Sequence, residues 1–203
     1  MPQGPLAANV AKNPSNSLAP MKLDAISNLL VAQGYAEHYT STARGNVGIA
    51  ANSSGVTTSV ALATTYVGLC LSSPAGSGKN LVLMNVTGSL LVAPAALTSI
   101  NLITGYAAGG ITAHTTPLTP ANAIIGTTST LVAKADSACT LVGTPAWTMP
   151  LAQANTATGA AFFNNNINGF IILPPGAYAA IGTNIAGPSS GFWGSFVWEE
   201  VDA

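Results

Sequence analysis

Residues 81–92, Leu-Val-Leu-Met-Asn-Val-Thr-Gly-Ser-Leu-Leu-Val, decide the fold class of this chain. Apolar side chains fall on every second position of the stretch, and this set is Val82, Met84, Val86, Leu90 and Val92, broken only by Gly88. The positions between them carry the polar set Asn85, Thr87 and Ser89. Because successive side chains of a strand point to opposite faces, this period of two predicts a half-buried antiparallel strand.

The same period of two recurs along residues 131–141. One face carries Leu131, Ala133, Ala135, Cys139 and Leu141, and the other carries Lys134, Asp136 and Thr140. Further strands are predicted at runs bounded by Gly, Pro, Ser and Asn, namely 47–51, 60–71, 98–106, 169–173, 177–182 and 192–200. Many short strands without alternating long helices predict an all-β fold, a jelly roll or β-sandwich.

Two stretches between these strands are rich in Thr, Ala, Asn and Pro, and we expect them to be long connections. They are residues 107–128 and 143–168. Connections of such length usually make contacts or carry function, so they are candidates for a binding surface.

Residues 1–44 are predicted to be an extended N-terminal arm with one short helix, and residues 45–203 to be the jelly-roll domain. The first twenty residues contain four prolines and few sizeable apolar side chains, so they cannot bury enough surface to fold alone. We therefore expect the arm to be held by its own domain or, by preference, by a neighbouring subunit.

The helix is expected at residues 21–33. Leu23, Ile26 and Leu30 fall at helical spacing, Pro20 suits the first turn and Gly34 suits the stop. The sequence leaves open whether this helix packs on its own domain or docks on a partner.

Charge is scarce along the whole chain. Charged residues make up 5% of it, against about 25% in an average soluble domain, and the formal net charge is −1. Little electrostatic repulsion keeps such molecules apart, which favours a subunit covered by neighbours over a monomer with a neutral polar surface. Five scattered Lys and Arg residues offer no basic stripe for nucleic acid. No stretch approaches the roughly 18 apolar residues of a membrane span.

The remaining composition points to a protein made in a cytoplasm without a cleaved leader. Residues 1–5, Met-Pro-Gln-Gly-Pro, lack the charged and apolar regions of a signal peptide. Cys70 and Cys139 each lie in an apolar, strand-like run, and we expect both to be buried free thiols.

Two stretches resemble catalytic or nucleotide-binding motifs, but the residues around them do not fit those functions. Residues 73–80 resemble a phosphate loop, but Ser73 and Asn80 replace required residues and a strand follows, so a hairpin loop is expected. Residues 187–191 match Gly-x-Ser-x-Gly around Ser189, but a strand follows and no histidine lies beyond it. Glu199 and Glu200 should point to opposite faces of a strand, as solvated or interfacial charges. We therefore expect no enzyme, no catalytic residues, no metal and no cofactor.

Aromatic residues gather in the last quarter of the chain. Phe192, Phe196 and Trp198 share one face of the last predicted strand, and Trp193 and Val197 share the other. Three interpretations remain open: a core strand buried on both faces, an aromatic interface between subunits, or a sugar-binding platform.

Two segments resemble the virion jelly-roll proteins of tailed bacteriophages. Residues 169–178, Gly-Phe-Ile-Ile-Leu-Pro-Pro-Gly-Ala-Tyr, are similar to the strand–Pro-Gly–strand corner of trimeric jelly rolls. Residues 192–200, Phe-Trp-Gly-Ser-Phe-Val-Trp-Glu-Glu, are similar to their closing strand. The resemblance implies a capsid cement or decoration protein, or a head or tail fibre subunit, assembled as a homotrimer in the virion, without catalytic residues.

The expected function is therefore that of a capsid cement or decoration subunit. Its partners would be copies of itself and the major capsid protein or another virion protein, with no nucleic acid and no membrane. The expected assembly contacts are Leu6, Val10, Leu18, Leu23, Ile26, Leu30, Trp193 and Trp198. The alternative is a receptor- or carbohydrate-binding module, which exposure of Trp147 or Trp193 would favour.

Overall fold

The computed structural model describes residues 36–58, 62, 64–155, 161–185 and 191–203. The chain divides into two units, Met1–Tyr39 and Thr40–Ala203, and the strands found in the described residues all belong to the second. The helix expected at 21–33 lies outside the described residues, as do the arm contacts Leu6, Val10, Leu18, Leu23, Ile26 and Leu30. Within the described ranges one helix is found, α1 (Tyr39–Ala43), which the sequence analysis did not predict.

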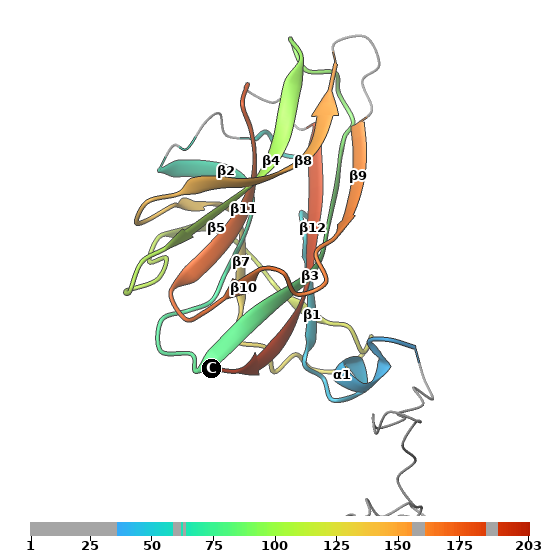
Figure 1. The fold of residues 1–203 in the computed structure, drawn as a ribbon, viewed down its shortest axis with the longest axis vertical. Coiled ribbons are helices and arrows are strands. Elements are labelled where there is room, and N and C mark those ends of the chain that lie inside the picture. The colour runs from blue at the N-terminus through green and yellow to red at the C-terminus, as the bar shows by residue number, and fades with distance from the viewer. Residues whose placement is uncertain (1–35, 59–61, 63, 156–160, 186–190) are drawn as a thin grey trace, which may run out of the picture. The chain divides into compact units, whose positions relative to one another are not determined.

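Two antiparallel sheets make up this second unit (Figure 1). The first has the order β10-β3-β12-β1-β6, with β9 also paired to β3, and the second has the order β5-β7-β2-β11-β4-β8. The strands of the first sheet are β1 (Val47–Ala51), β3 (Lys79–Leu90), β6 (Ala121–Asn122), β9 (Ala161–Asn166), β10 (Ile172–Leu173) and β12 (Phe192–Asp202). Those of the second are β2 (Thr65–Ser72), β4 (Thr98–Tyr106), β5 (His114–Leu118), β7 (Lys134–Thr140), β8 (Ala146–Ala154) and β11 (Ala177–Thr183). The predicted all-β fold, a sandwich of jelly-roll type, is confirmed.

The predicted strands coincide with the interior of the sheets, and the errors lie at the edges. Strands β1 and β4 have the predicted bounds, whereas the expected connections 107–128 and 143–168 are wrong because they contain β5, β6, β8 and β9. Each of these four strands pairs on one side within its sheet. Edge strands are often polar or contain proline, as Pro117 in β5 and Pro150 in β8 illustrate, so they lack the alternation that marks a half-buried strand.

A β-bulge changes which residues of β3 face the core. The pairing with β12 shifts so that Val197 lies opposite Asn85 and Trp198 opposite Leu83, which leaves Met84 as the extra residue. An extra residue reverses the alternation of faces on one side of the bulge. Leu83 is therefore buried whereas Val82 is half-buried, and the predicted position of Val82 on the core face is wrong.

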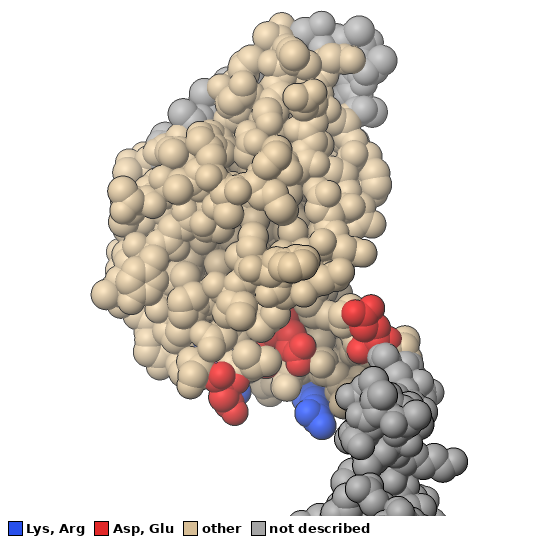
Figure 2. Space-filling model, in the orientation of Figure 1, with Lys and Arg blue, Asp and Glu red and all other residues tan. Residues whose placement is uncertain are grey.

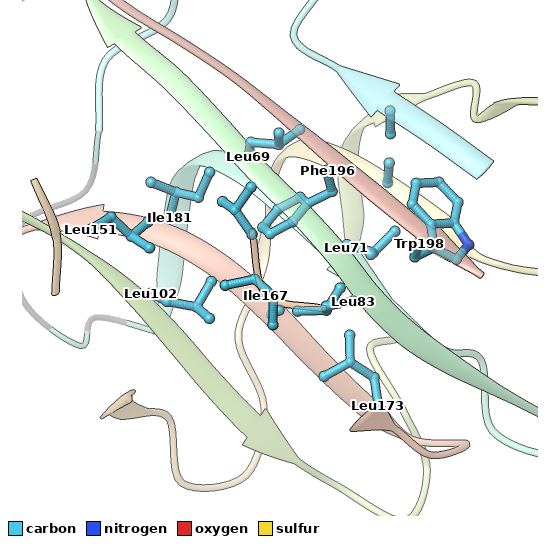
Figure 3. Close-up of a cluster of buried hydrophobic side chains, with 14 of the residues drawn as sticks. Leu69, Leu71, Leu83, Leu102, Leu151, Ile167, Leu173, Ile181, Phe196 and Trp198 are labelled. Atoms are coloured by element: carbon cyan, nitrogen blue, oxygen red, sulfur yellow. The ribbon is translucent and has the colours of Figure 1, made fainter. Parts of the chain in front are cut away.

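The main core lies between the two sheets and consists almost entirely of aliphatic and aromatic side chains (Figure 3). Leu69 and Leu71 of β2 and Ile181 of β11 meet side chains from the first sheet, all of them buried. Phe192, Phe196 and Trp198 share one face of β12 as predicted, and this face packs in the core, since each side chain is 0% exposed. Burial of each such side chain contributes roughly 1.5–3 kcal/mol, so this interior is the main source of stability. The interpretation of a strand buried on both faces is wrong, because Trp193 on the other face is 40% exposed.

A second, smaller cluster covers the other face of the second sheet. It combines Tyr66, Cys70, Ile103, Cys139, Tyr178 and Ala180 of the strands with Ile111 and Leu141 of the neighbouring segments. All residues of β11 are consequently buried, on both faces of the strand. The expectation of two buried free thiols is confirmed.

The connection between β2 and β3 passes from one sheet to the other, so the predicted hairpin at residues 73–80 is wrong. A strand does follow it, as expected, and the Ser73 hydroxyl donates to the carbonyl of Lys79 at 3.0 Å. No helix in the described part of the chain has the length and apolarity that crossing a membrane requires.

Candidate interaction surface

Charged side chains of the β-sandwich gather at one end. Lys79 begins β3 and lies opposite Asp202 at the end of β12, where their Nζ and Oδ1 atoms are 2.6 Å apart. Lys134 begins β7 at the same end, because it pairs with Ser72, the last residue of β2 before the connection to β3. Glu199 pairs with Val47, the first residue of β1, and Arg44 lies three residues before that strand begins. Figure 2 shows this segregation, with the rest of the visible face free of charged residues.

The uncharged exterior exposes large apolar side chains. Those with at least two fifths of their area exposed in the β-sandwich are Leu91, Val92, Leu97, Tyr106, Ile125, Trp147, Phe162, Phe170, Ile172 and Trp193. Phe170 and Ile125 are extreme, at 91% and 86% exposed. Exposed apolar surface of this kind marks contact sites when it is contiguous, and some of these side chains line two hollows in the described part of the chain.

One such hollow lies on the outer face of the first sheet. Ser89 of β3 pairs with Phe162 of β9 on one side and with Trp193 of β12 on the other. Two exposed aromatic side chains therefore flank a serine across three adjacent strands. They border a groove of about 220 Å³, which we call the aromatic groove; it is lined by Ala51, Thr87, Gly88, Ser89, Phe162, Trp193, Gly194 and Ser195.

Polar side chains continue this face beyond the aromatic pair. Thr87 lies opposite Asn164 on one side and Ser195 on the other, and the Thr87 and Ser195 hydroxyls are hydrogen-bonded to each other. Asn85, two residues further along β3, donates from Nδ2 to Oδ1 of Asn164 at 2.7 Å and of Asn166 at 2.6 Å. Hydroxyls and amides thus form two cross-strand rows beside the aromatic row.

A second hollow, of about 430 Å³, lies between segments of both sheets. Its lining is Thr104, Gly105, Tyr106, Thr144, Ala146, Thr148, Ile171, Ile172, Leu173, Pro174 and Ala177. It includes the exposed side chains of Tyr106 and Ile172. Its remaining polar groups are chiefly threonine hydroxyls, two of which, Thr104 and Thr148, are hydrogen-bonded to each other at 2.6 Å.

The two tryptophans expected at assembly contacts have different positions. Trp193 is 40% exposed and borders the aromatic groove. Trp198 is 0% exposed and lies in the core, so its indole offers no surface to a neighbour and its place among the assembly contacts is corrected. Trp193 and Trp198 are five residues apart on β12, so their side chains point to opposite faces of the strand. The bulge in the pairing of β12 with β3 does not change this, because its extra residue lies on β3. Trp147 of β8 is 41% exposed.

Glu200 differs from the solvated or interfacial charge that the sequence analysis expected. It is 5% exposed, and its carboxylate accepts hydrogen bonds from the backbone N–H groups of Val132, at 3.0 Å, and Ala133, at 2.9 Å. The Trp198 indole N–H points to the same carboxylate at 3.4 Å. Glu200 is therefore a structural residue that holds the segment before β7.

The sequence analysis also missed a histidine–aspartate pair. Nδ1 of His114 lies 2.7 Å from Oδ2 of Asp136, which was expected on a polar strand face but is 0% exposed. Burial raises the pKa of the Asp136 carboxyl, although His114 and Lys134 oppose the shift. His114 lies in an expected connection and Asp136 in an apolar strand, so no sequence pattern links them.

This pair lies beside two thiols, Cys70 opposite Asp136 and Cys139 opposite His114. Burial, Cys139 and Asp136 together raise the pKa of the Cys70 thiol, which keeps it in the protonated, weakly nucleophilic form. In the residues that the structure describes, no three His, Cys, Asp or Glu side chains are placed to hold a metal ion.

Ser189, the candidate of the Gly-x-Ser-x-Gly stretch, lies outside the described residues, and β12 follows the stretch as expected. In the aromatic groove, exposed aromatic and polar side chains lie on adjacent strands. No protein-family model matches this chain, and neither a curated protein nor a solved structure does.

Proposed function

We propose that this chain is a structural subunit of a virion, a capsid cement or decoration protein that associates with copies of itself and with a capsid protein. The resemblance of residues 169–178 and 192–200 to phage virion jelly rolls supplies the biological setting. The jelly-roll-type sandwich is compatible with that setting. The proposed assembly is a homotrimer.

The segregation of charge carries this proposal. When a surface is buried in an assembly, each charge on it loses its hydration, which costs several kcal/mol unless a partner compensates. Apart from the end that carries Lys79 and Asp202, the face of the described β-sandwich seen in Figure 2 has no charges to desolvate, and the sandwich exposes side chains such as Phe170 and Ile125. Apolar area removed from water contributes roughly 25 cal/mol per Å², so such faces favour association.

A mass measurement with two protein lengths tests the proposal. Light scattering coupled to gel filtration gives the mass of the full chain and of a variant that lacks residues 1–34. The full chain should be oligomeric, and circular dichroism should show that the shortened chain keeps its β fold. If residues 1–34 reach a neighbouring subunit, the oligomer of the shortened chain should dissociate at a higher protein concentration than that of the full chain. A full chain that is monomeric contradicts the proposal.

A second candidate function is a receptor- or carbohydrate-binding module. The observation that favours it is the exposure of Trp147 and Trp193, at 41% and 40%. Tryptophans with an exposed ring face are anchors for ligands as well as for proteins. A glycan array separates the two functions, because an assembly subunit needs no saccharide.

A further inference from the structure

We propose that the aromatic groove binds an uncharged saccharide, with one sugar ring between Phe162 and Trp193 and the next along the row of Thr87, Asn164 and Ser195. This inference rests on the second candidate function and names its site and ligand class. It is independent of the assembly proposal, because surfaces outside the aromatic groove can make the contacts between subunits.

The spacing of the two aromatic side chains fits a ring held between them. Phe162 and Trp193 stand on β9 and β12, and β3 with the small side chain of Ser89 lies between them. Adjacent strands are about 4.8 Å apart, so the two aromatic residues are separated by roughly 9.6 Å at the backbone. The Phe162 side chain is 73% exposed, which leaves its ring open to a ligand.

The floor of the groove is formed by backbone and supported from below. Gly88 and Gly194 are directly paired and face the core, where a Cβ on Gly88 would lie 2.5 Å from the Phe163 ring. A Cβ on Gly194 would lie 2.7 Å from the Phe192 ring. Because core aromatic rings press against these glycines, the floor is fixed before any ligand arrives, which lowers the entropic cost of binding.

The polar row beside the aromatic pair supplies the groups that a sugar needs. Hydroxyls of Thr87 and Ser195 can both donate and accept hydrogen bonds. The Asn164 and Asn166 amides accept at Oδ1 from Asn85, which fixes their orientation and leaves Nδ2 as the donor of each amide. Sugar hydroxyls form such hydrogen bonds, while the weakly positive C–H face of the ring packs on the electron-rich faces of aromatic rings.

The lack of charged side chains in the aromatic groove favours an uncharged ligand over an anionic one. None of the residues that line the aromatic groove is ionisable, and the charged end of the sandwich lies at the opposite ends of β3 and β12. An anionic sugar or a nucleic acid would find no cation here. A groove of about 220 Å³ is also smaller than the pockets of roughly 300–1,000 Å³ that hold drug-sized ligands, so it suits one or two ring-sized groups.

The test uses the full chain with a glycan array and then titration by isothermal calorimetry, which needs no tryptophan as reporter. The probes are neutral hexasaccharides of glucose, mannose and N-acetylglucosamine, with a sialylated oligosaccharide as the anionic comparison. We expect at least one neutral probe to bind and the sialylated one to bind no better. Trp193→Ala and Phe162→Ala should each weaken binding about tenfold or more, as loss of one stacked ring does. Trp193→Phe should retain part of the affinity.

Phe170→Ala is the matched control, because Phe170 is an aromatic side chain that is 91% exposed but does not line the aromatic groove. It should leave the affinity unchanged, and thermal unfolding should show that all variants are folded. The inference is overturned if no neutral probe binds or if Trp193→Ala binds like the wild type. It is also overturned if Trp193→Ala and Phe162→Ala change the oligomeric mass instead, because a second copy then occupies the groove. Loss of saccharide binding at unchanged mass leaves the assembly proposal intact.

Discussion

The carboxylate of Glu200 accepts a hydrogen bond from the backbone N–H of Ala133, at 2.9 Å, in the interior of the protein. This contact connects β12 of the first sheet to the segment that leads into β7 of the second. Glu200→Gln keeps the size of the side chain but removes the charge that two backbone donors share. We expect the free energy of unfolding in a urea titration to fall by about 1–3 kcal/mol.

Glu199→Gln is the control for this variant, because Glu199 is the adjacent carboxylate on the outer face of β12. Its substitution should change the free energy of unfolding by about 0.5 kcal/mol or less. Equal effects at the two positions would show that Glu200 does not hold the segment before β7.

Gly48 is required because Trp198, its direct partner across β1 and β12, lies against its backbone. A Cβ on Gly48 would lie 2.5 Å from Cε2 of Trp198 and 2.8 Å from Cδ1 of Leu131. Gly48→Ala should lower the free energy of unfolding by about 1–3 kcal/mol, the usual cost of overpacking a core. Gly109→Ala, where an added Cβ meets no atom within 4 Å, should have little effect. If Gly48→Ala is as stable as the wild type, the Trp198 ring does not pack against Gly48.

The Tyr66 hydroxyl satisfies backbone groups at the irregular pairing of β2. It accepts from the N–H of Leu69 at 2.7 Å and of Ile181 at 3.1 Å, and it faces their carbonyls at 2.8 Å and 2.6 Å. Tyr66→Phe deletes the hydroxyl in a place without access to water, and we expect a loss of about 1–3 kcal/mol of stability in thermal or urea unfolding. The exposed Tyr106→Phe is the comparison; if both variants unfold alike, the hydroxyl contributes nothing at this position.

Asp136 should make stability depend on pH in the direction opposite to that of a salt-bridged surface carboxylate. Burial raises its pKa in the folded protein above 3.8, so the folded chain holds this proton at pH values where the unfolded chain has released it. The wild type therefore loses stability relative to Asp136→Asn as the pH rises from 3.8 to the raised pKa. Urea unfolding of both proteins at a series of pH values measures this difference. Parallel pH profiles, or a difference that grows in favour of the wild type, would contradict the assignment.

The interior of the fold could be predicted from the sequence, because burial on one face imposes the period of two. Strands β1 and β4 have the predicted bounds, and Phe192, Phe196 and Trp198 share one face of β12 as predicted. The edge strands could not be predicted in this way. Thr115 and Thr116 of β5 are exposed on both faces, so nothing in the local pattern distinguishes them from a loop.

The candidate site was predictable only in part. Trp193 was expected at an assembly contact, on the face of the last strand opposite Phe192, but its relation to Phe162 depends on β9, which lies within the expected connection 143–168. The insertion of Met84 at the β3 bulge likewise follows from pairing with β12 and leaves no mark in the sequence of β3 alone. Glu200 was misread for a similar reason, since its partners Val132 and Ala133 are distant in the chain.

The mass of the full chain in solution tests the central claim most directly. On the assembly proposal, neighbouring subunits bury the apolar surface that carries no charge. Sedimentation equilibrium of the purified protein should then give an oligomer, expected near three times the 20.2 kDa of one chain. The oligomer should persist in high salt, because apolar contacts are not screened as charge pairs are. A single species of 20.2 kDa that stays monomeric as the concentration increases would contradict the account.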